Sequence, residues 1–205
     1  MSSGCAASFA LRHVATCLFT VALTSACGSS PEPLYFALSP SPGTARAVPL
    51  GPVEIREPGI AGYLDHSELL ARSSGNELYL ARSERWGEPL GRMIGRVIAE
   101  DLTARLQETV IVTEASGISV QPATLVELGI QRFDYGVGGQ VKLRAQVALH
   151  DASDVRPPTV RTITRSATPA AATTRAMVAA MSALLGGLSD EIANMLVARG
   201  SRPAP

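Results

Sequence analysis

The residues that could do covalent chemistry in this chain are few, and its cysteines come first among them. They are Cys5, Cys17 and Cys27, and no cysteine follows. The remaining 178 residues therefore offer no thiol for a disulfide, for cysteine-type metal ligation or for nucleophilic catalysis. Any sulfur chemistry of this protein is confined to its N-terminal segment.

The second candidate is Asp65-His66-Ser67, which contains the three residue types of a hydrolase triad. Neighbours in sequence do not face one another as a triad requires, so we interpret them as loop residues ahead of a strand. We interpret His150-Asp151, at the end of a predicted strand, as a solvated turn. The sequence has no glycine-rich phosphate loop, no HExxH and no GxSxG. We therefore expect no enzyme activity, no cofactor and no metal.

Cys27 differs from the other two cysteines in what surrounds it. Arg12 and His13 precede an apolar run over residues 14–23, which is too short to span a bilayer and is typical of a signal-peptide core. Small residues at 24–26 then lead directly into the cysteine. This order resembles a bacterial lipobox, with one departure: Thr24 stands where leucine is usual, and the leucine is one position earlier.

The resemblance predicts that Cys27 becomes the first residue of the mature protein, carrying acyl chains on its sulfur and its amino group. The alternative is ordinary signal-peptide cleavage beside Cys27, which would release a soluble protein. Several acyl chains would hold the protein to a membrane, since each buried methylene contributes about 0.8 kcal/mol. Gly28, rather than an aspartate, follows the cysteine. By analogy with enteric sorting rules, this favours the outer membrane, with the protein facing the periplasm.

The rest of the chain divides by composition. We predict a signal peptide over 1–26, a lipidated cysteine and flexible tether over 27–48, a folded domain over 49–200 and a disordered tail over 201–205. The tether is rich in Pro, Ser and Gly, and about twenty such residues span on the order of 25 Å. Within it, residues 34–38 form either a short edge strand or part of the linker. The 18 basic and 18 acidic residues cancel, which argues against a nucleic-acid partner.

Short alternating segments predict several strands in the folded domain. The strongest are two long segments joined by a glycine-rich turn, and the first changes phase near Gln131, which predicts a β-bulge. A hairpin is expected around Gly75-Asn76. The predicted strands cover residues 53–56, 69–72, 76–83, 109–113, 124–136, 139–151 and 159–167, the last as a polar edge strand.

Two amphipathic helices are predicted, over about 85–107 and 173–199. In the first, apolar residues at three- and four-residue spacing form one stripe, and Arg92, Arg96, Glu100 and Arg105 mark the opposite face. Gly91 and Gly95, one turn apart, indicate a face packed close to another backbone. The order of elements predicts an α+β fold: a two-layer sandwich of a mostly antiparallel sheet with both helices on one face.

The ordered set of motifs resembles a known family, the ABC-type transport auxiliary lipoproteins, which include the paraquat-inducible lipoprotein C (PqiC-like) group. The residues that carry the resemblance are Cys27, then "YFALSP", then "GYLDHSELLARSSGNELYLARSERWGEPL" leading into the first helix, then "IQRFDYGVGGQVKLRAQVAL" and the terminal helix. The resemblance covers nearly the whole mature chain.

The resemblance implies a non-enzymatic lipoprotein of the outer membrane that serves an intermembrane lipid-transport system. Its partners would be an MCE-domain transport protein and ABC or other inner-membrane components. The lipoprotein would dock the far end of the transport conduit and support envelope integrity, and it could itself form a homo-oligomeric ring. The candidate partner surface consists of Tyr63, Leu64, Asp65, Arg85 and Trp86.

Two alternatives stay open from the sequence. Trp86, the only tryptophan, is either an anchor of the core or a contact residue for a partner. The protein itself is either this auxiliary lipoprotein, a soluble periplasmic enzyme or small-ligand binder that discards Cys27, or an envelope lipoprotein without a transporter.

Overall fold

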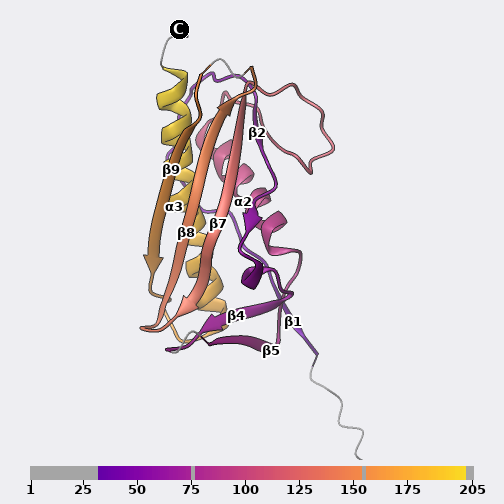
Figure 1. The fold of residues 1–205 in the computed structure, drawn as a ribbon, viewed down its shortest axis with the longest axis vertical. Coiled ribbons are helices and arrows are strands. Elements are labelled where there is room, and N and C mark those ends of the chain that lie inside the picture. The colour runs from indigo at the N-terminus through magenta and orange to yellow at the C-terminus, as the bar shows by residue number, and fades with distance from the viewer. Residues whose placement is uncertain (1–31, 75–76, 154–155, 202–205) are drawn as a thin grey trace, which may run out of the picture. The chain divides into compact units, whose positions relative to one another are not determined.

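Strand β7 (Thr124–Gly136) is the longest strand and organises the sheet around it (Figure 1). The structure is a computed structural model that describes residues 32–74, 77–153 and 156–201. The chain divides into residues 1–32 and residues 33–205, and the fold described here is that of the second part. Cys27 and the predicted signal peptide lie outside the described residues, as does the predicted hairpin turn at Gly75-Asn76.

One edge of β7 pairs along its whole length with β8 (Gln140–Asp151), and β8 pairs in turn with β9 (Thr159–Ala167). Both pairings are antiparallel. The register of β7 against β8 shifts between Ile130 and Arg132, which confirms the predicted bulge. Apolar side chains of β8 alternate toward the core, as the sequence predicted, while most of β9 is exposed.

The other edge of β7 is taken in turn by three short strands that run parallel to it. These are β2 (Val53–Ile55), β3 (Gly59–Ile60) and β4 (Glu68–Arg72). Strand β2 also pairs in parallel with β6 (Ile111–Thr113). The sheet is therefore mixed, and the prediction of a mostly antiparallel sheet was wrong. Alternation of apolar residues shows which face is buried and does not distinguish the two strand directions.

Strands β4 and β5 (Leu78–Trp86) form the predicted antiparallel hairpin. On the far side of β5 lies β1 (Leu34–Phe36), which runs parallel to it. Of the two interpretations of this segment, the edge strand is therefore correct. Figure 1 shows β4 and β5 crossing the lower end of the domain, where β1 begins.

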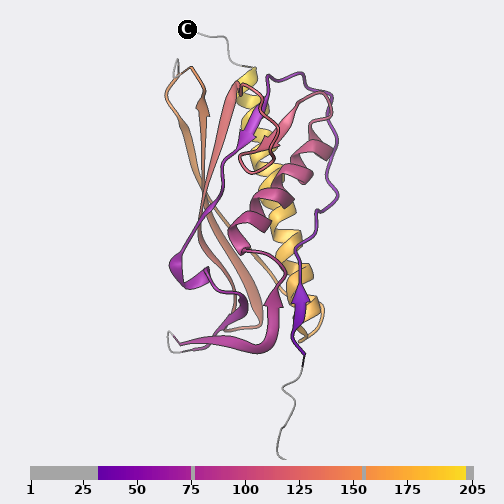
Figure 2. The same cartoon turned by 90° about the vertical axis from the view of Figure 1, so that its right-hand side faces the viewer.

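Two helices complete the fold, α2 (Leu90–Arg105) and α3 (Thr174–Gly200). Figure 2 shows both on the same side of the β7–β9 strands. The two predicted glycines of α2 pack closely, because a Cβ at Gly91 would lie 3.0 Å from the Pro58 carbonyl oxygen and a Cβ at Gly95 would lie 3.0 Å from Pro58 Cδ. This confirms the close approach inferred from their spacing.

Helix α3 is long and apolar enough to cross a membrane by length and composition, with a mean hydropathy of 1.3. However, 61% of its most apolar window is buried within the domain. It is the only described helix that meets this test. Its side chains pack on α2, β8 and β9, so α3 is a core helix.

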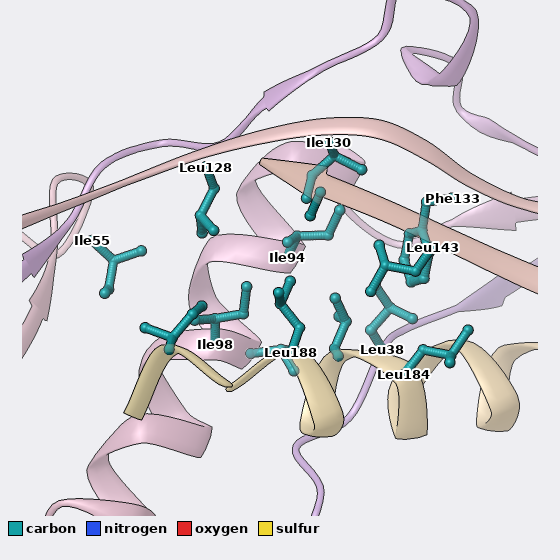
Figure 3. Close-up of a cluster of buried hydrophobic side chains, with 14 of the residues drawn as sticks. Leu38, Ile55, Ile94, Ile98, Leu128, Ile130, Phe133, Leu143, Leu184 and Leu188 are labelled. Atoms are coloured by element: carbon teal, nitrogen blue, oxygen red, sulfur yellow. The ribbon is translucent and has the colours of Figure 1, made fainter. Parts of the chain in front are cut away.

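Residues 37–48 form an extended segment that lies along the helices, here called the N-terminal strap. Its Leu38 is only 2% exposed and lies among apolar side chains of α2, α3 and the sheet (Figure 3). The Leu38 amide donates to Met93 Sδ at 3.0 Å, and the Arg46 amide donates to the Arg105 carbonyl oxygen at 2.8 Å. The sequence predicted a flexible tether up to residue 48, but residues 34–48 are part of the packed domain.

Candidate interaction site

The five residues of the predicted partner surface lie close together but do not share one environment. The short 3-10 helix η1 (Gly62–Leu64) carries the first two, and the end of β5 carries Arg85 and Trp86. Leu64 and Trp86 are buried, at 3% and 7% exposure, and both belong to the main hydrophobic core. Of the two interpretations of Trp86, the structure places it as a core anchor.

Tyr63 is half-buried and belongs to a polar cluster beneath the surface. Its hydroxyl donates to Asp134 Oδ2 at 2.8 Å, and the Arg72 guanidinium lies 5.0 Å from the centre of its ring. Asp134 is fully buried and also accepts from Arg132 Nε at 3.0 Å. Burial, together with the Asp134 carboxylate, raises the pKa of Tyr63. The phenol therefore stays protonated and acts as a donor that ties η1 to β7.

Asp65 and Arg85 are the members of the set that offer charge at the surface. Asp65 is exposed and follows η1. Arg85 is partly exposed and lies opposite Glu68 across the β4–β5 pair, with Nη2 3.6 Å from Glu68 Oε1. The Trp86 amide donates to the Ser67 carbonyl oxygen at 2.7 Å, which holds the two segments together. Of the five residues, Asp65 and Arg85 are thus the ones whose charged groups reach solvent, while Leu64 and Trp86 are buried.

The Asp65-His66-Ser67 triplet shows no triad arrangement. The His66 amide donates to the Leu64 carbonyl oxygen at 2.9 Å in a tight turn, and Ser67 Oγ donates to Glu68 Oε2 at 3.0 Å. His150 Nε2 lies 3.0 Å from Glu127 Oε2 on the exposed sheet face. Within the described residues, no group of three or more His, Cys, Asp or Glu side chains is placed to hold a metal ion.

The sequence did not reveal the most highly bonded polar residue of the domain, Arg105. Its exposure is 1%, so the prediction that it marks the solvent face of α2 was wrong. Its Nε donates to Asp190 Oδ1 at 2.7 Å, and Nη1 donates to the carbonyl oxygens of Ser41 and Asp101 at 3.0 Å. Nη2 donates to the carbonyl oxygens of Pro42 and Gly186. Arg105 thus joins the strap, α2 and α3.

Asp101, one turn before Arg105 on α2, is fully buried in the same cluster. It accepts from the Ser41 amide at 2.8 Å and from Ser189 Oγ at 3.0 Å, and its Oδ1 lies 3.4 Å from Arg105 Nη1. Burial raises the pKa of its carboxyl group. An aspartate at i and an arginine at i+4 of a helix usually form a surface pair, so only the packing of the strap distinguishes Asp101 and Arg105 from such a pair.

An apolar groove of about 350 Å³ lies beside the β4–β5 hairpin. Its wall is formed by Leu70, Tyr79 and Leu80 on one side and by Pro169 and Met177 on the other. The few polar groups in it include Glu84 and Thr174, and the Thr174 hydroxyl donates to Glu84 Oε1 at 2.7 Å. A groove lined by aliphatic and aromatic side chains with few polar groups is typical of a site that binds an apolar ligand or an apolar segment of a partner.

Comparison with known proteins places this fold. A crystal structure of an uncharacterised protein matches 81% of this chain and 99% of its own length, with a TM-score of 0.67 at 16% identity. A protein from Xanthomonas campestris matches 82% of this chain and 96% of its own, with a TM-score of 0.66 at 16% identity. At such identities the likeness shows the fold. None of the curated proteins compared with this chain matches it.

A family model for the ABC-type transport auxiliary lipoprotein component matches residues 36–193. That range begins at the last residue of β1 and ends within α3, so it spans the strap, strands β2 to β9, the whole of α2 and most of α3. The chain belongs to the family of ABC-type transport auxiliary lipoprotein components.

Proposed function

We propose that this protein is a periplasmic lipoprotein, anchored in the outer membrane through acylated Cys27, that docks an MCE/ABC-type lipid-transport conduit and does no chemistry itself. The observation that carries the proposal is the family match, which spans nearly all of the described domain. The lipobox-like order around Cys27 supports the anchor, and Gly28 supports the outer membrane. The MCE-domain and inner-membrane partners come from the family resemblance.

The packing of the strap supports a short distance between the domain and its anchor. Only the six residues 28–33 separate Cys27 from Leu34, where β1 begins. Seven Cα–Cα steps of a fully extended chain span at most about 25 Å. The domain would therefore work close to the membrane surface rather than at the end of a long tether.

Of the five residues of the predicted partner surface, only those with exposed side chains can contact a partner directly. Asp65 and Arg85 would contact the partner, while Leu64 and Trp86 support them from the core and Tyr63 fixes η1. Trp86→Ala is an unsuitable test of capture, because truncating a buried tryptophan costs about 3–5 kcal/mol of stability. Charge reversal at the two exposed positions is the sharper change.

The experiment is affinity capture of the tagged full-length protein from mildly solubilised envelopes, with intact-mass analysis of the captured chain. We expect a mature chain that begins at acylated Cys27, together with an MCE-domain protein. Cys27→Ala should abolish the acyl mass and the outer-membrane location. Asp65→Arg with Arg85→Glu should weaken partner capture while leaving the acyl mass unchanged.

The matched control is Arg144→Glu, which reverses an exposed charge on β8, on the sheet face opposite the core. Its capture should equal that of the wild type. If the captured chain is unmodified and comes down alone, the lipoprotein assignment is wrong and a soluble ligand binder that uses the apolar groove becomes the better explanation. An acylated chain without a transport partner would indicate an envelope lipoprotein that acts alone.

A further inference from the structure

Exposed apolar side chains gather at one end of the domain. Nine large apolar side chains are exposed among the described residues, and six of them lie at the end where β1 begins. The six come from β1, from the start of β5 and from the β7–β8 turn: Leu34, Tyr35, Leu78, Tyr79, Leu80 and Val137. We call these six residues the apolar end. The other three are scattered over the remainder of the fold: Val110, Ile118 and Val160.

The start of β5 is exposed on both of its faces. Successive side chains of a strand point to opposite faces, yet Leu78, Tyr79 and Leu80 are 40%, 55% and 45% exposed. A strand that packs on a core buries one face, so this part of the hairpin projects beyond the core. Exposed apolar strands of this kind promote aggregation unless something covers them.

In the sequence, the proposed anchor Cys27 precedes this end by only a few residues. Leu34 and Tyr35 are 61% and 66% exposed, and they are the seventh and eighth residues after Cys27. Because the chain from Cys27 to Leu34 spans at most about 25 Å, acylation of Cys27 would bring β1 to the bilayer surface. Figures 1 and 2 both show that the β4–β5 hairpin lies across the same end.

The side-chain types fit the boundary between lipid and water. Tyrosine and leucine at the edge of a protein are typical of segments that sit at the headgroup level. The charged residues of β5, of the position just before it and of the start of α3 are three arginines and two glutamates: Arg82, Arg85, Arg175, Glu77 and Glu84. Their net charge is only +1. Attraction to this end therefore has no large electrostatic component and should depend weakly on salt.

We propose that the apolar end lies in the interface of the bilayer that holds the anchor, so that the protein is fixed by two contacts rather than one. The inference rests on the proposed acylation of Cys27. A single flexible anchor leaves orientation free, whereas a second contact made by β1 and the hairpin sets which face of the domain points away from the membrane. The surface formed by β2, β6 and the C-terminal end of α3 is then turned toward the periplasm. The proposed partner contact Arg85, which pairs with Tyr35 of β1, lies beside the membrane contact, so a partner would reach it at the membrane surface.

The test uses the mature lipoprotein reconstituted in vesicles of phosphatidylethanolamine and phosphatidylglycerol, with brominated acyl chains as a fluorescence quencher. Tyr79→Trp places a reporter at the apolar end, and Ile118→Trp and Val160→Trp are controls with similar exposure elsewhere. We expect the added emission of Tyr79→Trp to shift to shorter wavelength and to be quenched by the brominated lipid, in low and in high salt. The two controls and buried Trp86 should stay unquenched.

Unquenched emission from Tyr79→Trp in an acylated chain would overturn the proposal. If that emission is nevertheless shifted to shorter wavelength, protein covers the apolar end, either a second copy or a transport partner. If the intact mass shows no acyl group, the proposed anchor fails and this inference falls with it. The capture experiment thus separates failure of the function from failure of the membrane contact.

Discussion

Arg105 shows how a charged residue can act as a structural link in this domain. Each nitrogen of its guanidinium donates at least one hydrogen bond, and the acceptors come from the strap, α2 and α3. Buried arginine is costly unless its donors are satisfied, and here they are. The residue therefore fixes the path of the strap rather than adding a surface charge.

Replacing Arg105 should lower the free energy of unfolding of the domain. Arg105→Ala leaves Asp101 buried without its cation and frees the carbonyl oxygens of the strap, so we expect a loss of about 3–5 kcal/mol in the free energy of unfolding. Arg96→Ala is the matched control, because Arg96 on the same helix pairs with Glu88 and Glu100 at the surface. It should cost no more than about 1 kcal/mol. Urea denaturation of both variants measures the difference, and equal losses would contradict a linking role.

Asp151, at the end of β8, makes stability depend on pH. Hydrogen bonds from Arg156 Nε at 2.7 Å and from Arg199 Nε at 2.8 Å lower the pKa of its carboxyl group. The folded protein thus binds this proton less tightly than the unfolded chain does. Its contribution is present above the ordinary aspartate pKa of about 3.9 and is lost as pH falls through the lower folded value.

Asp151→Asn should therefore be less stable than the wild type at pH 7, with the gap narrowing below pH 4. Denaturant midpoints measured across this range test the sign. A gap that stays constant with pH would show that the carboxylate charge contributes nothing.

At the scale of elements, the strap packs closely against α3 at a single glycine, Gly186. A Cβ at Gly186 would lie 2.5 Å from Ser41 Cβ, whereas a Cβ at Gly187 would meet only the flexible side chain of Arg165, at 3.4 Å. An adjacent glycine pair inside a helix favours a bend and by itself distinguishes neither glycine. The structure shows that one of the two is required where the strap crosses.

The two glycines should respond in opposite directions to the same substitution. Gly187→Ala should stabilise the protein by up to about 1 kcal/mol, because alanine favours the helix and finds room. Gly186→Ala should destabilise it by about 1–3 kcal/mol, because the methyl group pushes against the strap. The thermal unfolding midpoints of the two variants, each compared with the wild type, test this prediction. Stabilisation by both would mean that the strap yields freely.

At the scale of the whole molecule, the folded domain begins earlier than composition indicates. Strand β1 supplies a neighbour for β5, and the strap supplies Leu38 to the core and acceptors to Arg105. A domain starting at residue 49 would lack all three. The segment between the proposed anchor Cys27 and the first strand is correspondingly short, at six residues.

A chain that starts at residue 49 should be less stable than one that starts at residue 33. Loss of Leu38 burial alone costs about 1.5–3 kcal/mol, and the unpaired edge of β5 adds to it. Circular dichroism during thermal unfolding compares the two chains. An unchanged midpoint would restore the predicted boundary and show that the strap is only loosely held.

Much of the fold was predictable because the main strands and helices have characteristic apolar patterns within their own residues. The period of apolar residues identified α2, α3 and the long strands, and the phase change near Gln131 identified the bulge. The candidate partner surface was predictable only as a set of neighbouring segments. Which of its members face solvent depended on how η1 and β5 dock, so Leu64 and Trp86 proved to be core residues.

The sequence by itself determined the type of each main element, the family resemblance and the cysteine at which an anchor is expected. Each of these depends on residues near one another in the chain or on the order of such segments along it. The tertiary structure decided the parallel pairings of β7, the burial of Arg105 and the packing of the strap. These depend on contacts between residues such as Ser41, Arg105 and Gly186, which are 64 and 81 positions apart. The Pro- and Ser-rich composition of the strap indicates that ordering it costs conformational entropy. The contacts that offset this cost, such as the burial of Leu38 and the hydrogen bonds to Arg105, are visible only in the tertiary structure.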